Sequence, residues 1–331
     1  MLGWALPVLL AVSFGGYFHF YKLMDYGKVL HSHRPGRCRV VEGPVQGSED
    51  IEVIEKDGIA FVTSGLLYLD VKDDIDGKIF LYDFSQPTTP GAKLKAVELP
   101  IKGDNFDKEN FHPHGSSHWM VNGVIRLFIV NHDSTFKHSI EIFDYDRNGK
   151  TLIHKKSIKG DALVRPNDVA AAGPDSFFFT NDGAAQTQLS NSAEILLGIR
   201  LGTIGYYDGK AFHNLLDGLG GSNGIAFDSK TSTLYVSMIL DETINAYKVS
   251  KDRKSLTLLS STQLHSGPDN IFIDSDGSLY TGAHPITYLA VKHIKECSNL
   301  EYYAPSQVLR LKYNKPNEPA AVTEVYANDG T

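Results

Sequence analysis

Cysteine is scarce in this 331-residue chain, which contains only Cys38 and Cys297. Two cysteines are too few to make a disulfide framework, so a small disulfide-stabilised fold is excluded. The chain also has no Asn-x-Ser/Thr sequence, and N-glycosylation therefore gives no support for secretion. Basic residues form no stripe, and the formal net charge is −7 at pH 7. We therefore expect no nucleic-acid partner.

Charged residues are missing from the start of the chain. No Lys, Arg, Asp or Glu occurs between Leu2 and Tyr21. This apolar run is about long enough for a short membrane helix, and it lacks the basic start of a cleaved signal peptide. We expect residues 1–30 to form a hydrophobic helix that is an uncleaved signal anchor or lies on a membrane. A basic cluster follows the helix and favours a cytosolic C-terminal side, so the membrane topology stays open.

Long helical periodicity is nearly absent after residue 30, and no linker or low-complexity run divides the rest of the chain. Short alternating segments rich in β-branched and aromatic residues are separated by Asp/Gly turns, and 30 glycines and 14 prolines supply further turns. Two short helices are expected between strands, over 185–200 and 285–298. The sequence therefore predicts one all-β domain over residues 31–331.

Five polar clusters recur in this domain, each just before a short apolar stretch. Four of them carry carboxylate or amide oxygens, the fifth carries an imidazole, and their spacing of roughly 45–65 residues is typical of β-propeller blades. Any one cluster could be an ordinary turn. Five in register indicate oxygen ligands that converge on a central axis, which suits a hard cation such as Ca²⁺. The clusters are Gly47-Ser48-Glu49-Asp50, Pro113-His114-Gly115, Pro166-Asn167-Asp168, Ser222-Asn223-Gly224 and Pro268-Asp269-Asn270.

Further segments join these clusters in an order that resembles the serum paraoxonase/arylesterase family over about 36–331. They include Val130-Asn131-His132, Thr180-Asn181-Asp182, His284-Pro285 and Val325-Tyr326-Ala327. The resemblance implies a six-bladed β-propeller with two Ca²⁺ ions in its central tunnel. It implies hydrolysis of lactones, aryl esters and, in some members, organophosphates. It also implies an N-terminus that associates with a membrane or lipid surface, and hence a protein of the secretory pathway, membrane-associated or extracellular.

The resemblance implies two calcium sites with separate ligands. Adjacent members of a cluster, such as Glu49 and Asp50, point to opposite faces of the chain, so each can serve a different ion. The catalytic Ca²⁺ would be bound by Glu49, Asn167, Asn223, Asp269 and Asn270, and the structural Ca²⁺ by Asp50, Asp168 and the backbone carbonyl near Ser116.

The resemblance also implies a catalytic histidine dyad, His114 and His132. A neutral imidazole with a pKa near 6.5 can take a proton from water, and a second imidazole can orient the first and carry the proton outward. Calcium would polarise the carbonyl oxygen of the substrate. Tyr68 and His284 are candidates for substrate contact, although Tyr68 could equally be an ordinary exposed loop aromatic.

The C-terminus departs from the family pattern. The two strands that end the family's last blade have no counterpart after Val325-Tyr326-Ala327, nor does the cysteine that would pair with Cys38. We therefore expect the sixth blade to be incomplete and the fold to be less stable, because an open blade leaves strand edges unpaired. A Cys38–Cys297 bridge stays an open alternative.

The leading hypothesis is a calcium-dependent arylesterase/lactonase acting on a small-molecule lactone or ester. The alternative is a non-catalytic, membrane-anchored accessory or chaperone-like propeller protein. A third hypothesis is a propeller of the gluconolactonase or strictosidine-synthase type, which the Pro113-His114-Gly115 and Ser48-Glu49-Asp50 contexts fit less well. The complete set of proposed ligands and both histidines favour the enzyme.

Overall fold

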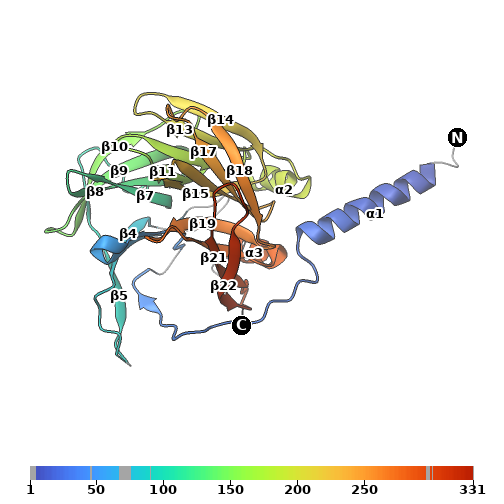
Figure 1. The fold of residues 1–331 in the computed structure, drawn as a ribbon, viewed down its shortest axis with the longest axis horizontal. Coiled ribbons are helices and arrows are strands. Elements are labelled where there is room, and N and C mark those ends of the chain that lie inside the picture. The colour runs from blue at the N-terminus through green and yellow to red at the C-terminus, as the bar shows by residue number, and fades with distance from the viewer. Residues whose placement is uncertain are drawn as a thin grey trace.

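Five β-sheets follow one another along the chain in a computed structural model that describes residues 5–44, 47–66, 76–89, 91–295, 299 and 301–330 (Figure 1). Each sheet is a meander in which strands adjacent in sequence pair antiparallel. The first two sheets gain a fifth, outer strand that pairs parallel. The prediction of an all-β propeller is confirmed.

The strands have the following bounds. The first sheet contains β1 (Val41–Glu42), β2 (Ile51–Ile54), β3 (Ile59–Ser64), β4 (Lys78–Asp83) and β5 (Leu94–Glu98). The second contains β6 (Ile101–Lys102), β7 (Pro113–Val121), β8 (Val124–His132), β9 (His138–Asp146) and β10 (Thr151–Ile158). The third contains β11 (Pro166–Ala171), β12 (Phe177–Asn181), β13 (Gly202–Tyr207) and β14 (Phe212–Leu219). The fourth contains β15 (Ser222–Asp228), β16 (Thr233–Met238), β17 (Thr243–Val249) and β18 (Leu256–Gln263), and the fifth contains β19 (Gly267–Ile273), β20 (Leu279–His284), β21 (Ser306–Lys312) and β22 (Ala321–Asn328).

Successive sheets share their hydrophobic cores. Phe177, Phe178 and Phe179 of β12 are all buried. Alternate side chains of a strand point to opposite faces of the sheet, and a neighbouring sheet packs against each face. Phe177 and Phe179 pack in the core shared with the second sheet, and Phe178 packs in the core shared with the fourth. Equivalent clusters join the first sheet to the second and the fourth to the fifth. The stacking of these apolar faces sets the order of the sheets around the centre.

The prediction of six blades is wrong, because the strands of the described residues form five sheets and leave none for a complete or partial sixth. The sixth blade was taken from the family resemblance, whereas the polar clusters themselves number five. Among the described residues, no buried apolar cluster joins the fifth sheet to the first. Those sheets meet through polar contacts, in which Asn270 Nδ2 donates to the backbone oxygen and Oε1 of Glu49, both at 3.0 Å.

The N-terminal segment crosses the same boundary. His33 and Ala327 of β22 exchange backbone hydrogen bonds of 2.8 and 2.9 Å, and β1 pairs with β5 a few residues later. Before that, Lys28 Nζ lies 2.6 Å from both Asp25 and Glu242. This segment therefore links the fourth and fifth sheets to the first.

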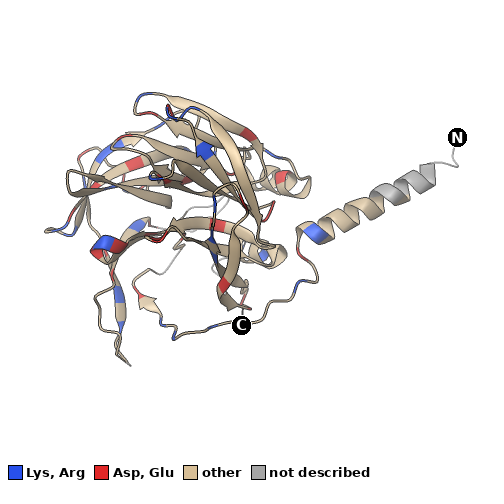
Figure 2. Cartoon of the chain, viewed as in Figure 1, with Lys and Arg blue, Asp and Glu red and all other residues tan. Residues whose placement is uncertain are grey.

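Three helices lie outside the sheets: α1 (Ala5–Leu23), α2 (Gln188–Leu196) and α3 (Thr287–Lys295). The predicted short helices over 185–200 and 285–298 are confirmed. Helix α1 extends away from the β body (Figure 1). Its only Lys or Arg is Lys22, in its last turn. In Figure 2 the blue of Lys and Arg on the described part of this helix lies at the end that meets the body. No helix among the described residues combines the length and apolar character needed to cross a membrane. The signal-anchor prediction for residues 1–30 stays a prediction.

The structure describes only one of the two cysteines that were considered for a Cys38–Cys297 bridge. Cys38 is exposed and has no disulfide, whereas Cys297 lies outside the described residues.

Candidate active site

The polar clusters occupy the same position in each of the four later sheets, at the start of the innermost strand. The pairing register shifts there in every case, which is the mark of a β-bulge. A bulge takes residues out of the ladder and re-aims their side chains, so the repeat in sequence becomes a repeat in geometry. The shifts lie between Pro113 and Ser116, Pro166 and Val169, Ser222 and Ile225, and Pro268 and Ile271.

Two glycines of these clusters allow the innermost strands to approach each other closely. A Cβ atom on Gly115 of β7 would lie 2.6 Å from the Cα atom of Asp168 in β11. A Cβ atom on Gly224 of β15 would lie 2.5 Å from the backbone oxygen of Asp269 in β19. The glycines are therefore needed for the close approach of backbones that brings polar side chains from several sheets together.

The five predicted ligands of the catalytic Ca²⁺ share one property in the structure. Each has a buried side-chain oxygen without a hydrogen-bond partner, and these five oxygens are among only eight buried side-chain nitrogen and oxygen atoms without a partner in the described residues. An orphaned buried polar atom is costly, so it needs an explanation such as an ion. The atoms are Glu49 Oε2, Asn167 Oδ1, Asn223 Oδ1, Asp269 Oδ1 and Asn270 Oδ1.

This donor set fits calcium, because every orphaned atom is a hard carboxylate or amide oxygen. A metal cluster built from three or more His, Cys, Asp or Glu side chains is not found in the described part of the chain. The two observations agree, since three of the five orphaned oxygens belong to asparagines. Asp269 and Asn270 are adjacent on β19, and Asn270 also bonds to Glu49 on the first sheet.

The two carboxylates predicted for the structural Ca²⁺ are buried and interact electrostatically. Ser116 donates to Asp50 Oδ2 from its backbone N–H at 2.7 Å and from its hydroxyl at 2.6 Å. Ile225 donates its N–H to Asp168 Oδ2 at 2.8 Å. Burial, together with the charge of Glu49, raises the pKa of Asp50 to about 7. Burial and the charge of Asp50 raise the pKa of Asp168 as well, so a cation would stabilise both carboxylates. The Ser116 carbonyl stays a predicted ligand.

The predicted dyad histidines are in direct contact. His114 Nδ1 lies 2.8 Å from His132 Nε2, and His114 Nε2 lies 3.4 Å from Glu49 Oε1. Although burial opposes its charge, Glu49 raises the pKa of His114. Burial and the charge of His114 hold the pKa of His132 well below its usual value. The pair therefore combines a ring that favours a proton with a ring that does not.

A third histidine was not predicted. His132 Nδ1 lies 2.7 Å from Nδ1 of His138, which is the residue paired with His132 across strands β8 and β9. No sequence motif contains His138. Its only signal was its place opposite His132 in a hairpin.

The substrate-contact predictions have different outcomes. His284 Nε2 lies 2.7 Å from Asp269 Oδ2, at the edge of the proposed metal cluster. His284 also lines a cavity of about 1120 Å³ together with Glu49, Asp50 and Asp168. His114, by contrast, is not among the described residues that line this cavity. Tyr68 lies outside the described residues.

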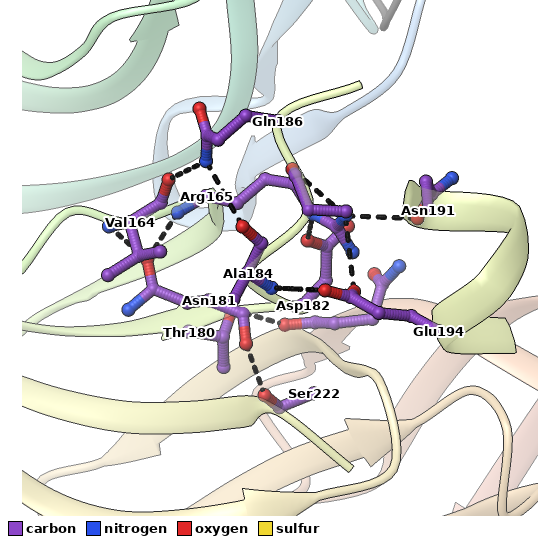
Figure 3. Close-up of polar contacts among 12 residues, drawn as sticks. Val164, Arg165, Thr180, Asn181, Asp182, Ala184, Gln186, Asn191, Glu194 and Ser222 are labelled. Atoms are coloured by element: carbon purple, nitrogen blue, oxygen red, sulfur yellow. Dashed lines mark hydrogen bonds and ion pairs between the residues drawn. The ribbon is translucent and has the colours of Figure 1, made fainter. Parts of the chain in front are cut away.

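Two neighbouring residues of β12, Thr180 and Asn181, hydrogen bond to the backbone in or just before the strands that carry the predicted ligands. Asn181 Oδ1 accepts the backbone N–H groups of Val164 and Arg165, both at 3.0 Å (Figure 3). Thr180 Oγ1 accepts the N–H of Asp168 at 3.2 Å and donates to the backbone oxygen of Asn223 at 2.6 Å. One threonine hydroxyl thus joins the backbones of two ligand clusters.

Arg165 fixes helix α2 beside this region. Its guanidinium pairs with Asp182 and Glu194 and donates to Asn191 Oδ1 at 2.9 Å (Figure 3). Asn191 and Glu194 belong to α2, and the three charged side chains are about nine-tenths buried. No sequence motif predicted this network.

The string Gly220-Gly221-Ser222-Asn223-Gly224 matches the Gly-x-Ser-x-Gly pattern of serine hydrolases. Ser222 begins strand β15, which leads to another strand rather than to a helix. Its hydroxyl is fully buried and donates to the backbone oxygen of Asn181 at 2.7 Å. The match therefore lacks the strand-to-helix turn that exposes a nucleophilic serine.

A protein-family profile described as Arylesterase matches residues 30–331. The chain belongs to the arylesterase family. Its relatives include serum paraoxonase/arylesterase 2 of Gallus gallus, which is 34% identical over 89% of this chain and 80% of the relative. Serum paraoxonase/lactonase 3 of Homo sapiens is 30% identical over 94% of this chain and 85% of the relative. Arylesterases and lactonases are ester-bond hydrolases, so the prediction of enzyme class is confirmed at the level of the family.

Two further similarities bear on the alternatives. Mechanosensory abnormality protein 6 of Caenorhabditis elegans is 29% identical over 93% of this chain and 82% of the relative. Among solved structures, the periplasmic gluconolactonase PpgL of Pseudomonas aeruginosa is 13% identical, covers 85% of this chain and 71% of its own, and has a TM-score of 0.50. At that identity, the similarity to PpgL shows a shared fold and nothing about function.

Proposed function

We propose that this member of the arylesterase family is a calcium-dependent hydrolase of lactones and aryl esters. One observation carries the proposal: Glu49, Asn167, Asn223, Asp269 and Asn270 each have a buried orphaned oxygen, and His114, which contacts His132, lies 3.4 Å from Glu49. The oxygens supply a cation site and the imidazoles supply an acceptor for a proton. Metal-assisted hydrolysis needs both.

Two cations are proposed. Glu49, Asn167, Asn223, Asp269 and Asn270 would hold the catalytic Ca²⁺, which supplies Lewis-acid polarisation of the substrate carbonyl when bound. The structural Ca²⁺ would be held by Asp50, Asp168 and the carbonyl of Ser116, where it offsets the repulsion between two buried carboxylates.

His114 is the proposed general base. Its Nε2 atom takes a proton from water while the water oxygen bonds to the carbonyl carbon of the substrate. The bond from that carbon to the leaving oxygen then breaks, and the leaving oxygen takes up a proton. The acid product ionises at neutral pH, so one proton in total must leave the site per turnover. His132 holds the His114 ring through the 2.8 Å contact and accepts a proton from its Nδ1 atom.

The test is turnover of phenyl acetate and of a panel of γ- and δ-lactones by the purified protein, with Ca²⁺ and then with excess EGTA. We expect EGTA, Asp269→Ala and Asn167→Ala each to abolish turnover. His114→Gln should lower kcat by about 10²–10⁴-fold while Ca²⁺ binding persists, since general-base catalysis contributes about that factor. The control is His213→Gln on β14, whose ring pairs with Asp208 in the third sheet.

Folded protein that binds Ca²⁺ but hydrolyses no substrate would contradict the enzyme proposal. That result would favour the alternative, a non-catalytic, membrane-anchored accessory or chaperone-like propeller protein. Turnover that persists in EGTA would instead contradict the metal requirement.

We also propose that α1 associates with a membrane or lipid surface, as expected of a secretory-pathway protein. Phe14 is 72% exposed and Phe18 is 50% exposed, and burial of such rings in lipid is favourable. Flotation with phosphatidylcholine vesicles should recover the protein, and Phe14→Ser with Phe18→Ser should reduce the floated fraction several-fold. Equal flotation of the double variant would contradict the proposal.

A further inference from the structure

Three imidazoles form a continuous chain through the second sheet. His114 lies on the innermost strand β7, His132 at the end of β8 and His138 at the start of β9. His114 Nδ1 to His132 Nε2 measures 2.8 Å, and His132 Nδ1 to His138 Nδ1 measures 2.7 Å. The first two rings are buried and the third is half-buried. The chain of nitrogens therefore leads outward from the proposed site, one strand at a time.

The hairpin turn between His132 and His138 is built to hold these two rings together. Phe136 adopts a φ of 58°, a left-handed conformation that is a genuine outlier for a bulky residue. In that conformation its ring stacks on His132 at 5.4 Å and meets His138 edge-on at 4.8 Å, measured between ring centroids. The left-handed conformation at Phe136 thus accompanies direct packing against both histidines.

Asp133 holds this turn in place through several hydrogen bonds. Its Oδ1 atom accepts hydrogen bonds from the N–H groups of Thr135 and Lys137 and from the Thr135 hydroxyl, each at 2.8 Å. Its own N–H donates to the Lys137 carbonyl, also at 2.8 Å. These bonds offset the local strain, so the ring of Phe136 and the two histidines have defined positions.

We propose that His138 is the outer member of a three-histidine proton relay that carries the proton of catalysis from His114 through His132 toward solvent. The inference rests on the proposed hydrolase function and deepens it. No covalent intermediate and no oxidant are needed, because each transfer between rings breaks one N–H bond and forms another. His138 acts through His132, so it is a positioning and relay residue.

The proton balance follows from the two nitrogens of each ring. In the receptive state His114 and His132 carry their protons on Nδ1, and His138 carries its proton on Nε2. When His114 Nε2 gains a proton from water, the His114 Nδ1 proton passes to His132 Nε2. The His132 Nδ1 proton then passes to His138 Nδ1, and His138 Nε2 releases its proton outward. One proton enters and one leaves, and each ring is neutral at the end.

The surroundings of His138 suit the terminal position. Its Nε2 atom is buried and has no hydrogen-bond partner of good geometry among the described residues, so the relay requires a water molecule there to take the proton onward. The carbonyl of Val164 and the charge of Asp182 both lie close enough to favour a proton there. Burial nevertheless lowers the pKa of His138 to about 4, so at pH 7 the ring keeps one proton and does not retain a second. A relay end that holds its proton weakly can pass it on.

The kinetic test compares His138→Ala and His138→Gln with the wild-type protein in phenyl acetate hydrolysis at low and high imidazole buffer. In weak buffer we expect kcat to fall about tenfold with KM unchanged, which is less than the loss of a general base because His114 and His132 remain in place. Gln can hydrogen bond to His132 but cannot relay a proton, so both variants should respond alike. High imidazole should restore kcat, because a mobile base replaces the missing ring. His213→Gln is the control that should remain insensitive to buffer.

Unchanged kcat of folded His138→Gln in weak buffer would overturn the relay, and so would a loss that imidazole cannot rescue. A second measurement does not depend on turnover. Wild-type protein labelled with ¹⁵N at histidine should show a coupling across the His132 Nδ1–His138 Nδ1 hydrogen bond, which His138→Gln removes. Absence of that coupling overturns the relay even if the protein hydrolyses no ester. A coupling without any turnover would contradict the proposed function alone.

Discussion

Gly115 shows how one residue controls the approach of two strands. Its position in β7 faces the backbone of Asp168 in β11, where a methyl group has no room. We expect Gly115→Ala to lower the free energy of unfolding by about 2 kcal/mol, as overpacking of a tight site does. It should also weaken Ca²⁺ binding, since Asn167 and Asp168 must shift. Urea unfolding and calcium titration measure the two effects.

The matched control is Gly282→Ala in β20. A Cβ atom there meets nothing within 4 Å, and the φ of this glycine is not in the left-handed region. We expect a change of less than about 0.5 kcal/mol, typical of a surface substitution. Equal effects of the two substitutions would show that space at Gly115 is not limiting.

The His118–Glu52 pair gives a pH dependence of stability. Burial works against the charge of His118, but its hydrogen bond and charge interaction with Glu52 raise the pKa above the ordinary value of 6.5. A raised folded-state pKa stabilises the fold fully below about pH 6.5, and the stabilisation is lost as the pH rises through the folded-state pKa. Glu52→Gln should therefore destabilise the protein by about 1 kcal/mol near pH 6 and by little at alkaline pH.

Unfolding in urea at several pH values, with saturating Ca²⁺, measures this difference. The control is Glu324→Gln, which removes an exposed partner of His33. That difference should be near zero at every pH, as for most surface pairs. A Glu52→Gln difference that grows with pH would have the wrong sign for this account.

At the scale of elements, Arg165 joins β11 to α2. Arg165→Met leaves Asp182 and Glu194 buried without their partner, and we expect a loss of about 3 kcal/mol. Hydrogen exchange of the α2 amides should become faster, because the helix loses its contacts through Glu194 and Asn191. The control is Arg200→Met, whose exposed pair with Asp241 should contribute less than about 1 kcal/mol. Unchanged exchange in α2 would contradict this anchoring role.

The strands and hairpins were predictable because they depend on local pattern. Alternating apolar residues and Asp/Gly turns identified strands such as β15 and β16, and the inserted helices fell within their expected ranges. The number of blades was not predictable in this way. It depends on how the fifth sheet meets the first, through contacts such as Asn270 with Glu49 that join residues 221 positions apart.

The candidate site was predictable to a similar extent. The ligand clusters stood out because they repeat, and the structure places an orphaned oxygen on each of the five predicted catalytic-calcium ligands. His138 was missed because its role depends on register: it faces His132 only when β8 and β9 pair. Arg165 was missed for a related reason, since its partners Asp182 and Glu194 come from a strand end and a helix.

At the scale of the whole molecule, the proposed catalytic calcium would join four of the five sheets. Its ligands come from the first sheet through Glu49, the third through Asn167, the fourth through Asn223 and the fifth through Asp269 and Asn270. The boundary between the fifth and first sheets has no shared apolar cluster among the described residues, so a cation bound there would add to the polar contacts that link the two sheets. Calcium should therefore stabilise the closed ring as well as support catalysis.

A ligand that binds only the folded state adds about 2.7 kcal/mol to the free energy of unfolding when present at about 100 times its Kd. For a chain of this size we expect Tm to rise by about 4 °C between EGTA and saturating Ca²⁺. Mg²⁺ should give a smaller rise, because it is smaller and demands regular octahedral geometry. Asp269→Asn should reduce the calcium effect, since it removes a charge but keeps the size of the side chain. Calorimetry in EGTA, in Ca²⁺ and in Mg²⁺ makes the comparison. A Tm that does not change with Ca²⁺ would show that polar contacts and the N-terminal segment close the ring without a cation.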